Sequence, residues 1–191
     1  AGASPPALFT DTTVAAPDGR VIKVRLAAPA KPSDNLGFIA FSHGANASGA
    51  LYDAIIGPIA AAGYLVAAPT HVDSESNPDR AKFDQAAVQS TRLVDMRILL
   101  DRMMDLAVAA PAAIGRFGDG RIAVAGHSYG ALVAQQLRGA WWAMQGGRRL
   151  AYVNYMGSIG EQAGMYVAIQ GSGKGHAYTN TPPVTHQHQQ W

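Results

Sequence analysis

One short motif has the residue types and spacing of a nucleophilic serine. Residues 121–125 (RIAVA) form a short apolar run with β-branched residues, which predicts a buried strand. Residues 126–130 (GHSYG) follow at once and match G-x-S-x-G, and residues 131–137 (ALVAQQL) predict a helix. A turn this sharp strains the serine backbone and leaves no room for side chains on either side, hence the glycines. The sequence therefore predicts Ser128 as a nucleophile; the alternative is an ordinary glycine-rich turn.

The elements that must position this serine follow from apolar patterning. We expect strands at residues 9–14, 20–26, 36–41, 64–68 and 121–125. Residues 52–62 predict a helix from their apolar, alanine-rich composition. Residues 85–106 predict another from apolar positions at helical spacing: Val88, Leu93, Met96, Leu99, Leu100 and Met103. Strands that alternate with helices predict a mostly parallel sheet covered on both faces.

Finer expectations concern single segments. Residues 20–26 alternate as an antiparallel edge strand would, Pro69 is expected to end the strand before it, and residues 117–120 are expected to turn. His71, near Asp73 and Glu75, is a candidate pocket or cation-binding residue, and we favour a loop position beside the site. Charges off the apolar stripe of the second helix predict a solvated face: Asp95, Arg97, Asp101, Arg102 and Asp105.

Size and composition narrow the class of protein. The 191 residues suffice for one domain, which we expect over 1–191, with a flexible entry at 1–8 and a polar tail at 178–191. Apolar residues make up 48% and charged residues 15%, which is typical of a globular chain. A net charge of +2 without a basic run predicts no nucleic-acid partner, and no apolar run is long enough for a membrane span. The absence of cysteine excludes disulfides, a cysteine nucleophile and thiolate metal sites.

Three segments resemble a known group of enzymes. Residues 41–45 (FSHGA), 69–77 (PTHVDSESN) and 125–131 (AGHSYGA) resemble the bacterial predicted dienelactone hydrolases. That group is similar to platelet-activating-factor acetylhydrolases and cutinase-like polyester hydrolases. The order of elements over residues 21–139 resembles the α/β-hydrolase fold. The resemblance implies an α/β fold, a mostly parallel sheet flanked by helices, with no cap domain.

The resemblance also implies an oxyanion hole. In this fold one donor is the backbone N–H of the residue after the nucleophile, here Tyr129. The loop after the third strand supplies the second, which the resemblance assigns to Ala45, with Asn46 as the next candidate. His43, Asn46 and His127 are assigned to the substrate site. We expect His43 to act through its backbone and His127 mainly to pack.

The base and acid follow from the usual order of serine, acid and histidine in this fold. His176 follows an apolar stretch at residues 165–169 and a glycine-rich turn, as the base of the family does. Glu161 is the only carboxylate side chain beyond Ser128, and we predict it as the acid. The alternative for each is a surface loop residue. His186 and His188 lie in the polar tail, where an H-x-H pair without a third ligand predicts no metal site.

The function implied is a serine carboxylic-ester hydrolase for small or short-acyl esters, without metal or organic cofactor. A lipase, thioesterase or polyester hydrolase would use the same machinery, and a true dienelactone hydrolase is excluded because its nucleophile is a cysteine. The region after Gly139 is shorter than the closing region of the family, which favours a degenerate binding or scaffold protein as the alternative from another class. It also leaves apolar sheet for a homodimer to cover. The start at Ala1 fits a mature or trimmed end, and we favour export, secreted or periplasmic.

Overall fold

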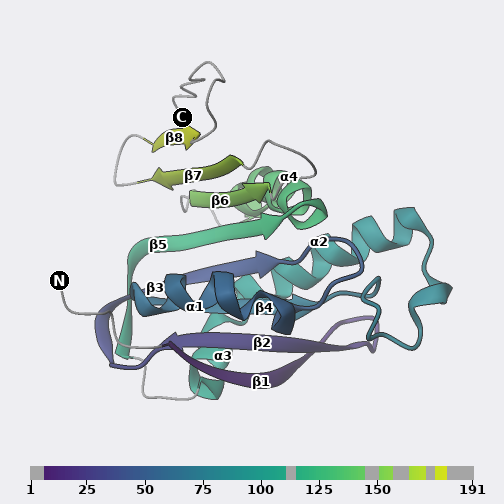
Figure 1. The fold of residues 1–191 in the computed structure, drawn as a ribbon, viewed down its shortest axis with the longest axis horizontal. Helices are drawn as coiled ribbons and strands as arrows, with labels where there is room; N and C mark the ends of the chain where they lie inside the picture. The colour runs from purple at the N-terminus through teal and green to yellow at the C-terminus, as the bar shows by residue number, and fades with distance from the viewer. Residues whose placement is uncertain (1–6, 111–114, 145–150, 157–163, 171–174, 180–191) are drawn as a thin grey trace.

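A single mixed sheet forms the centre of the protein in the computed structural model. The structure describes residues 7–110, 115–144, 151–156, 164–170 and 175–179. The sheet has the strand order β1-β2-β4-β3-β5-β6-β7-β8, from bottom to top in Figure 1. Its strands are β1 Ala7–Ala15, β2 Val21–Pro29, β3 Ser33–Ser42, β4 Tyr64–Thr70, β5 Gly115–His127, β6 Ala151–Met156, β7 Gly164–Gln170 and β8 Gly175–Thr179.

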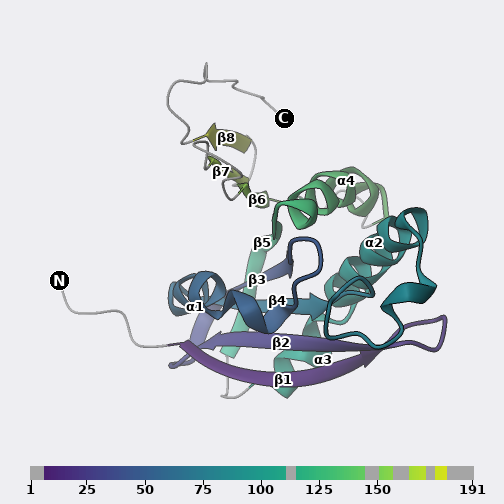
Figure 2. The same ribbon diagram turned by 45° about the vertical axis from the view of Figure 1, so that its right-hand side comes forward.

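Helices cover both faces of this sheet, as the alternating pattern predicts. Figure 2 shows α1 on one side and α2, α3 and α4 on the other. They are α1 Asp53–Ala61, α2 Gln85–Asp101, α3 Met103–Ala109 and α4 Tyr129–Met144, with short 3-10 helices η1 Gly49–Tyr52 and η2 Arg80–Lys82. Alternate residues of β3 supply both layers: Phe38 and Ala40 pack with α2 and α4, whereas Ile39 and Phe41 pack with α1.

Strand direction divides the sheet into a parallel centre and antiparallel flanks. β3 pairs in parallel with β4 and β5, and β5 pairs in parallel with β6. β1, β2 and β4 pair antiparallel, as do β6, β7 and β8. Only residues 157–163 and 171–174 connect the last three strands, whereas a parallel crossover needs about a dozen residues. The short closing region therefore allows hairpins only.

Several local expectations are corrected. β2 is not an edge strand, because β1 covers it and takes the edge. β4 continues through Pro69, where β2 is its only neighbour and a proline without N–H is tolerated. Residues 117–120 are part of β5 rather than a turn.

The ends of the sheet and the second helix also differ from expectation. β1 begins at Ala7 and β8 ends at Thr179, inside the segments expected as entry and tail. The long helix breaks into α2 and α3 at Arg102, whose φ of −102° and ψ of 17° leave the helical range. Within the described residues, no helix combines the length and the apolar character that a membrane span requires.

Candidate active site

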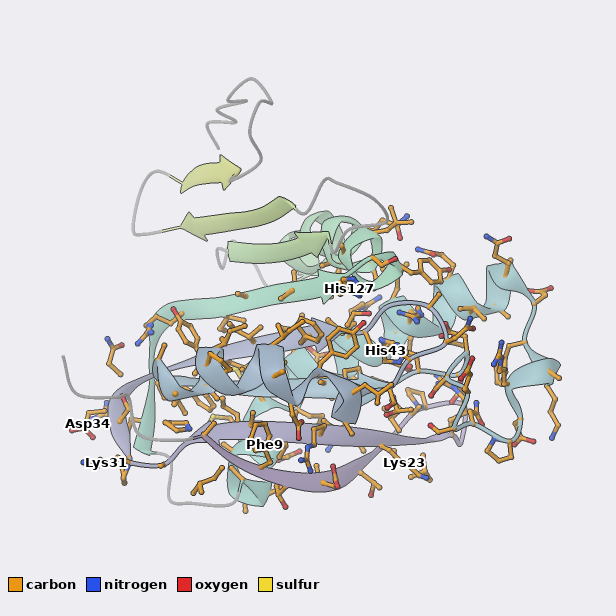
Figure 3. All side chains as sticks on the ribbon, viewed as in Figure 1. Phe9, Lys23, Lys31, Asp34, His43 and His127 are labelled. Carbon is orange, nitrogen blue, oxygen red and sulfur yellow. The ribbon has the colours of Figure 1, made fainter. Side chains whose placement is uncertain are left out.

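Ser128 lies where two parallel strands of the sheet centre end. Ser42 at the end of β3 pairs with Gly126 near the end of β5, so the loops after both strands leave the same edge. Figure 3 shows His43 and His127 near these two strand ends. Ser128 follows β5 directly and precedes α4, as the sequence predicts. Its side chain is exposed and its φ is 52°, a left-handed conformation that costs a non-glycine residue about 1–2 kcal/mol.

The glycines beside Ser128 permit close approaches of the backbone. A Cβ on Gly126 would lie 2.2 Å from the carbonyl oxygen of Gly130, across the turn itself. A Cβ on Gly130 would lie 2.0 Å from the carbonyl oxygen of Ser42. Any side chain at either position would therefore force the backbone apart. Gly130 also brings the start of α4 directly against the end of β3.

The loop after β3 contacts residues 126–130, here called the serine turn, through Tyr52 and His127. The N–H of Gly44 donates to the hydroxyl of Tyr52 at 2.9 Å, and that hydroxyl lies 2.7 Å from Nδ1 of His127. Burial lowers the pKa of His127, so the ring is neutral at neutral pH and one of its nitrogens accepts. Tyr52 thus links the loop to the residue before Ser128.

Two backbone N–H groups at this edge have no partner in the described part of the chain. The N–H of Tyr129 is the first of α4, where a helix leaves its donors unpaired, and the ring of Tyr129 is half-buried. The N–H of Ala45 is likewise unpaired, whereas that of Asn46 donates to Asp73 at 3.3 Å. Asn46 itself has a φ of 66°. Of the two candidates in this loop, Ala45 therefore has the free donor.

Arg92 of α2 is the fully buried cation beneath this loop. Its guanidinium binds Asp73 in a bidentate pair, with Nε–Oδ1 at 2.9 Å and Nη2–Oδ2 at 2.7 Å. It also donates to the backbone carbonyls of His43 at 2.6 Å and Gly44 at 3.1 Å. Burial raises the pKa of Asp73, but the hydrogen bonds and charge of Arg92 outweigh this, so the net shift is downward. Asp73 is thereby held as a carboxylate.

A second serine, Ser42, makes the hydrogen bonds of a catalytic triad without being accessible. Its Oγ lies 2.9 Å from Nε2 of His71, whose Nδ1 lies 2.9 Å from Oδ2 of Asp95. The side chains of all three are buried, and Arg92 also donates to Ser42 Oγ at 3.3 Å. No substrate carbonyl can reach such a hydroxyl, so this relay is part of the core. The expectation of a solvated Asp95 is wrong, whereas His71 does lie in the loop directly after β4, with its side chain buried.

Both histidines of this buried cluster are held neutral. Burial lowers the pKa of His43 well below its ordinary value, assisted by His71 and Arg92. Burial likewise lowers the pKa of His71, against the opposing pull of Asp95. The N–H of His71 donates to Nε2 of His43, which must therefore be unprotonated. The ring of His43 thus supports the loop from inside and does not face the surface.

The predicted base and acid are not brought to Ser128 by the described residues. Glu161 lies outside them, as do His186 and His188. His176 lies in β8 rather than in a loop, paired with Ile169 of β7. β6 and β7 separate β8 from β5, which at about 4.8 Å per strand puts the His176 backbone about 14 Å across the sheet.

Two cavities lie away from the serine turn. One of about 450 Å³ opens between the β1–β2 turn and the loop after β4, where Arg20, His71 and Asn77 contribute to its lining. The other, about 420 Å³, shares Lys23, Thr70 and Ser76 with it. Ser128 lines neither. Among the residues that the structure describes, no cluster of three or more His, Asp or Glu side chains could hold a metal ion.

Fold and serine turn together place the chain in the α/β-hydrolase fold class. A thermostable carboxylesterase cloned from a metagenomic library has a TM-score of 0.58 at 17% identity, over 84% of this chain and 51% of its own. The hyperthermophilic esterase of Pyrobaculum calidifontis has 0.55 at 19% identity, over 75% and 42%. A thermostable esterase from Pseudomonas putida has 0.55 at 18% identity, over 75% and 41%. At such identities the likeness establishes the fold, and the chain spans about half or less of these proteins.

The sequence match is more specific but shorter. Residues 19–103 match the family model of platelet-activating factor acetylhydrolase, isoform II. This segment includes the loop after β3, His71 and Arg92, and it ends before the serine turn. The comparison with curated proteins gives no match. The resemblance inferred from residues 41–45 and 69–77 is thus confirmed where those residues lie.

Sequence reasoning missed Arg92, Asp95 and Ser42. Arg92 and Asp95 are three positions apart on α2 and both face the sheet, but a charged pair at that spacing is normally a solvated one. Met96 could have indicated that Asp95 is buried, because the apolar pattern included Met96 and Asp95 is next to it in the sequence. Ser42 follows the apolar run of residues 36–41, so its buried hydroxyl gave no signal of its own.

Proposed function

We propose that this chain is a carboxylic-ester hydrolase whose nucleophile is Ser128. The observation that carries the proposal is the left-handed, exposed serine between β5 and α4, held by two glycines that admit no side chain. Such strain persists only when the surroundings enforce it, and it is typical of the nucleophile elbow of α/β-hydrolases. The esterases among the structural neighbours and the acetylhydrolase family match support the same reaction class.

The proposed reaction begins at the ester carbonyl. Ser128 Oγ attacks the carbonyl carbon while a base takes its proton, and the N–H groups of Tyr129 and Ala45 bind the oxyanion. When the tetrahedral intermediate collapses, the base returns the proton to the leaving alcohol. Water then attacks the acyl-enzyme by the same route and releases the acid. Neither donor has another partner among the residues that the structure describes, which supports this assignment.

The base and the acid are the part of the proposal that needs direct assignment. His176 and Glu161 remain the sequence-based candidates, and His176 is the first to test because two intervening strands separate its strand, β8, from β5. His176→Ala should reduce turnover as much as Ser128→Ala if His176 is the base. A His176→Ala variant with unchanged turnover removes it from the mechanism.

The substrate class we propose is small or short-acyl esters. Ser128 is exposed at the end of the sheet, and the described residues place neither of the two cavities around it. An open position offers little apolar surface to bury a long acyl chain. We expect 4-nitrophenyl acetate and butyrate to be turned over faster than the longer homologues.

The deciding experiment compares two serines of the same chain. Ser128→Ala should lower 4-nitrophenyl acetate turnover by at least about 10³-fold and abolish labelling by a fluorophosphonate probe. Ser42→Ala is the matched control and should keep both. Equal turnover and equal labelling of wild type and Ser128→Ala would overturn the esterase proposal and favour a binding or scaffold protein.

A further inference from the structure

One buried side chain, Arg92, donates to two successive carbonyls of the loop after β3. They are the carbonyls of His43 and Gly44, while Asp73 occupies the other edge of the guanidinium. Arginine presents five N–H donors in a rigid plane, so it can hold two carbonyls and a carboxylate in fixed relative directions. A lysine ammonium has three donors but no rigid plane, so it could not hold these acceptors in fixed relative directions.

Fixing the carbonyls fixes the opposite ends of the same peptide units. In a trans peptide the C=O and the N–H point in opposite directions. The carbonyl of His43 points to Arg92, and the N–H of the same unit, on Gly44, donates away from it to Tyr52. By the same geometry, the Gly44 carbonyl, which lies 3.1 Å from Arg92 Nη2 and 2.6 Å from Nδ1 of His43, turns the N–H of Ala45 away from the core.

The second donor is tied to the same guanidinium. The ring of Tyr129 lies over Arg92, with the guanidinium carbon 4.6 Å from the ring centre. Gly130, one residue on, approaches the carbonyls of Ser42 and His43 so closely that a Cβ would lie 2.0 and 2.7 Å from them. One side chain of α2 therefore contacts both segments that carry the proposed donors.

We propose that Arg92 is a positioning residue that sets the direction of the Ala45 N–H and its place relative to the Tyr129 N–H. This inference rests on the proposed function, because the two N–H groups matter only if an oxyanion forms between them. Stability alone is a weak reason for the arrangement, since buried ion pairs are often no better than apolar residues of similar volume. An apolar residue could not donate the two hydrogen bonds that Arg92 makes to the carbonyls of His43 and Gly44.

The test substitutes Arg92 by lysine and uses a second arginine as control. Arg25 forms the same bidentate pair with Asp53, with Nε–Oδ1 at 3.0 Å and Nη2–Oδ2 at 2.6 Å, but it contacts no carbonyl of the loop. Both Arg92→Lys and Arg25→Lys keep the charge and lose the fork. Far-UV circular dichroism and thermal unfolding establish the temperature at which both are folded, and all kinetics are measured below it.

The readouts separate positioning from general destabilisation. Arg92→Lys should lower kcat for 4-nitrophenyl acetate by about 10- to 100-fold, below the loss of a whole oxyanion donor, with KM nearly unchanged. Its affinity for a trifluoromethyl ketone, which forms the tetrahedral adduct, should fall by the same factor as kcat. Arg25→Lys should change none of the three.

Each outcome bears on one proposal. If wild type shows Ser128-dependent turnover and Arg92→Lys loses no more kcat than Arg25→Lys, the positioning role is wrong and the esterase proposal stands. A rise in KM that accounts for the whole loss also overturns it. If wild type itself shows no turnover that depends on Ser128, the proposed function fails, and this inference fails with it.

Discussion

The protein contains two serine sites that differ in opposite ways from a working hydrolase. Ser42 has the hydrogen-bonded histidine and aspartate of a triad, but it is buried and its hydroxyl is already bound by Arg92. Ser128 is exposed on a strained turn beside two unpaired N–H donors, and the described residues show no histidine base at its side. The proposal of Ser128 therefore rests on exposure, backbone strain and free donors rather than on a triad-like order of hydrogen bonds.

The two sites are nevertheless parts of one construction. The relay of Ser42, His71 and Asp95 and the clamp of Arg92 lie beneath the loop after β3, and this loop meets the serine turn. The hydrogen bonds at Ser42, at both ring nitrogens of His71 and at Oδ2 of Asp95 restrain these side chains, although Oδ1 of Asp95 has no hydrogen-bond partner among the described residues. We infer that the buried serine site stabilises the edge at which the exposed one lies. Variants of residues that both sites share, and of residues that belong to one site, can distinguish the role of the buried site from that of the exposed one.

The variant Gly130→Ala should disrupt both serine sites, because Gly130 lies where the turn around Ser128 contacts the end of β3. The added Cβ would meet the Ser42 carbonyl oxygen at 2.0 Å, a backbone contact that only a shift of β3 or α4 can relieve. We expect a loss of about 3 kcal/mol or more in the free energy of unfolding, together with loss of fluorophosphonate labelling, measured by urea unfolding and gel fluorescence.

The control for that prediction is Gly19→Ala. Gly19 also has a positive φ, 85°, but a Cβ there would have nothing within 4 Å. It should cost about 1–2 kcal/mol from backbone strain alone, with labelling unchanged. Equal stability losses in the two variants would contradict the close approach at Gly130.

The variant Asp95→Asn tests the buried relay without touching Ser128. Asp95 accepts from His71 and lies 2.9 Å from the Arg20 guanidinium, so removing its charge leaves a buried pair incomplete. We expect about 3 kcal/mol of destabilisation and esterase turnover that persists in the folded protein. Asp53→Asn, which breaks a more exposed pair with Arg25, should cost less than about 1 kcal/mol. Loss of turnover by more than about 10³-fold in a folded Asp95→Asn variant would contradict a role of this relay in stability alone.

Acid should lower the free energy of unfolding through the two buried histidines, His43 and His71. His43 and His71 have lowered pKa values in the folded state, so the unfolded chain binds protons that the folded chain refuses once the pH falls below about 6.5. Their contribution to stability is complete above that pH and is lost as the pH falls toward the folded pKa values. The slope should reach at most about 1.4 kcal/mol per pH unit for each histidine.

Urea unfolding at pH 7.5, 6.5 and 5.5 measures this slope. His127→Gln is the useful control, because His127 is only partly buried and its removal should leave most of the slope in place. A free energy of unfolding that stays constant from pH 7.5 to 5.5 would show that these histidines are not held neutral.

The smallest effect distinguishes the two serines by sign. Ser128→Gly relieves the left-handed strain and should stabilise the fold by up to about 1 kcal/mol. Ser42→Gly leaves His71 and Arg92 without one partner each and should destabilise by about 1–3 kcal/mol. Thermal and urea unfolding of the pair give the comparison, and effects of the same sign would contradict the assigned difference in strain.

A feature of this protein could be predicted from the sequence when the residues that form it are close together along the chain. The turn around Ser128 was predictable because its glycines, its strand and its helix lie within a few residues of one another. β3, β4 and the end of β5 were predictable for the same reason, apart from end positions such as Ser33 and Pro69, whereas β6 was not among the expected strands. The buried relay was not, because Ser42, His71 and Asp95 come from β3, the end of β4 and α2. Each of them alone has an ordinary surface interpretation.

The sequence by itself determined where a nucleophilic serine can lie, since strain and close approach at residues 126–130 are properties of the local chain. It also showed that the region after Gly139 is short, whereas its antiparallel pairing became evident only from the structure. Only the tertiary structure decided which serine is exposed, which N–H of the loop is free and which arginine holds it. Those outcomes depend on how β3, β5 and α2 pack together. Charged side chains normally stay in water, but they can be buried when their hydrogen-bond and ion-pair partners are buried with them.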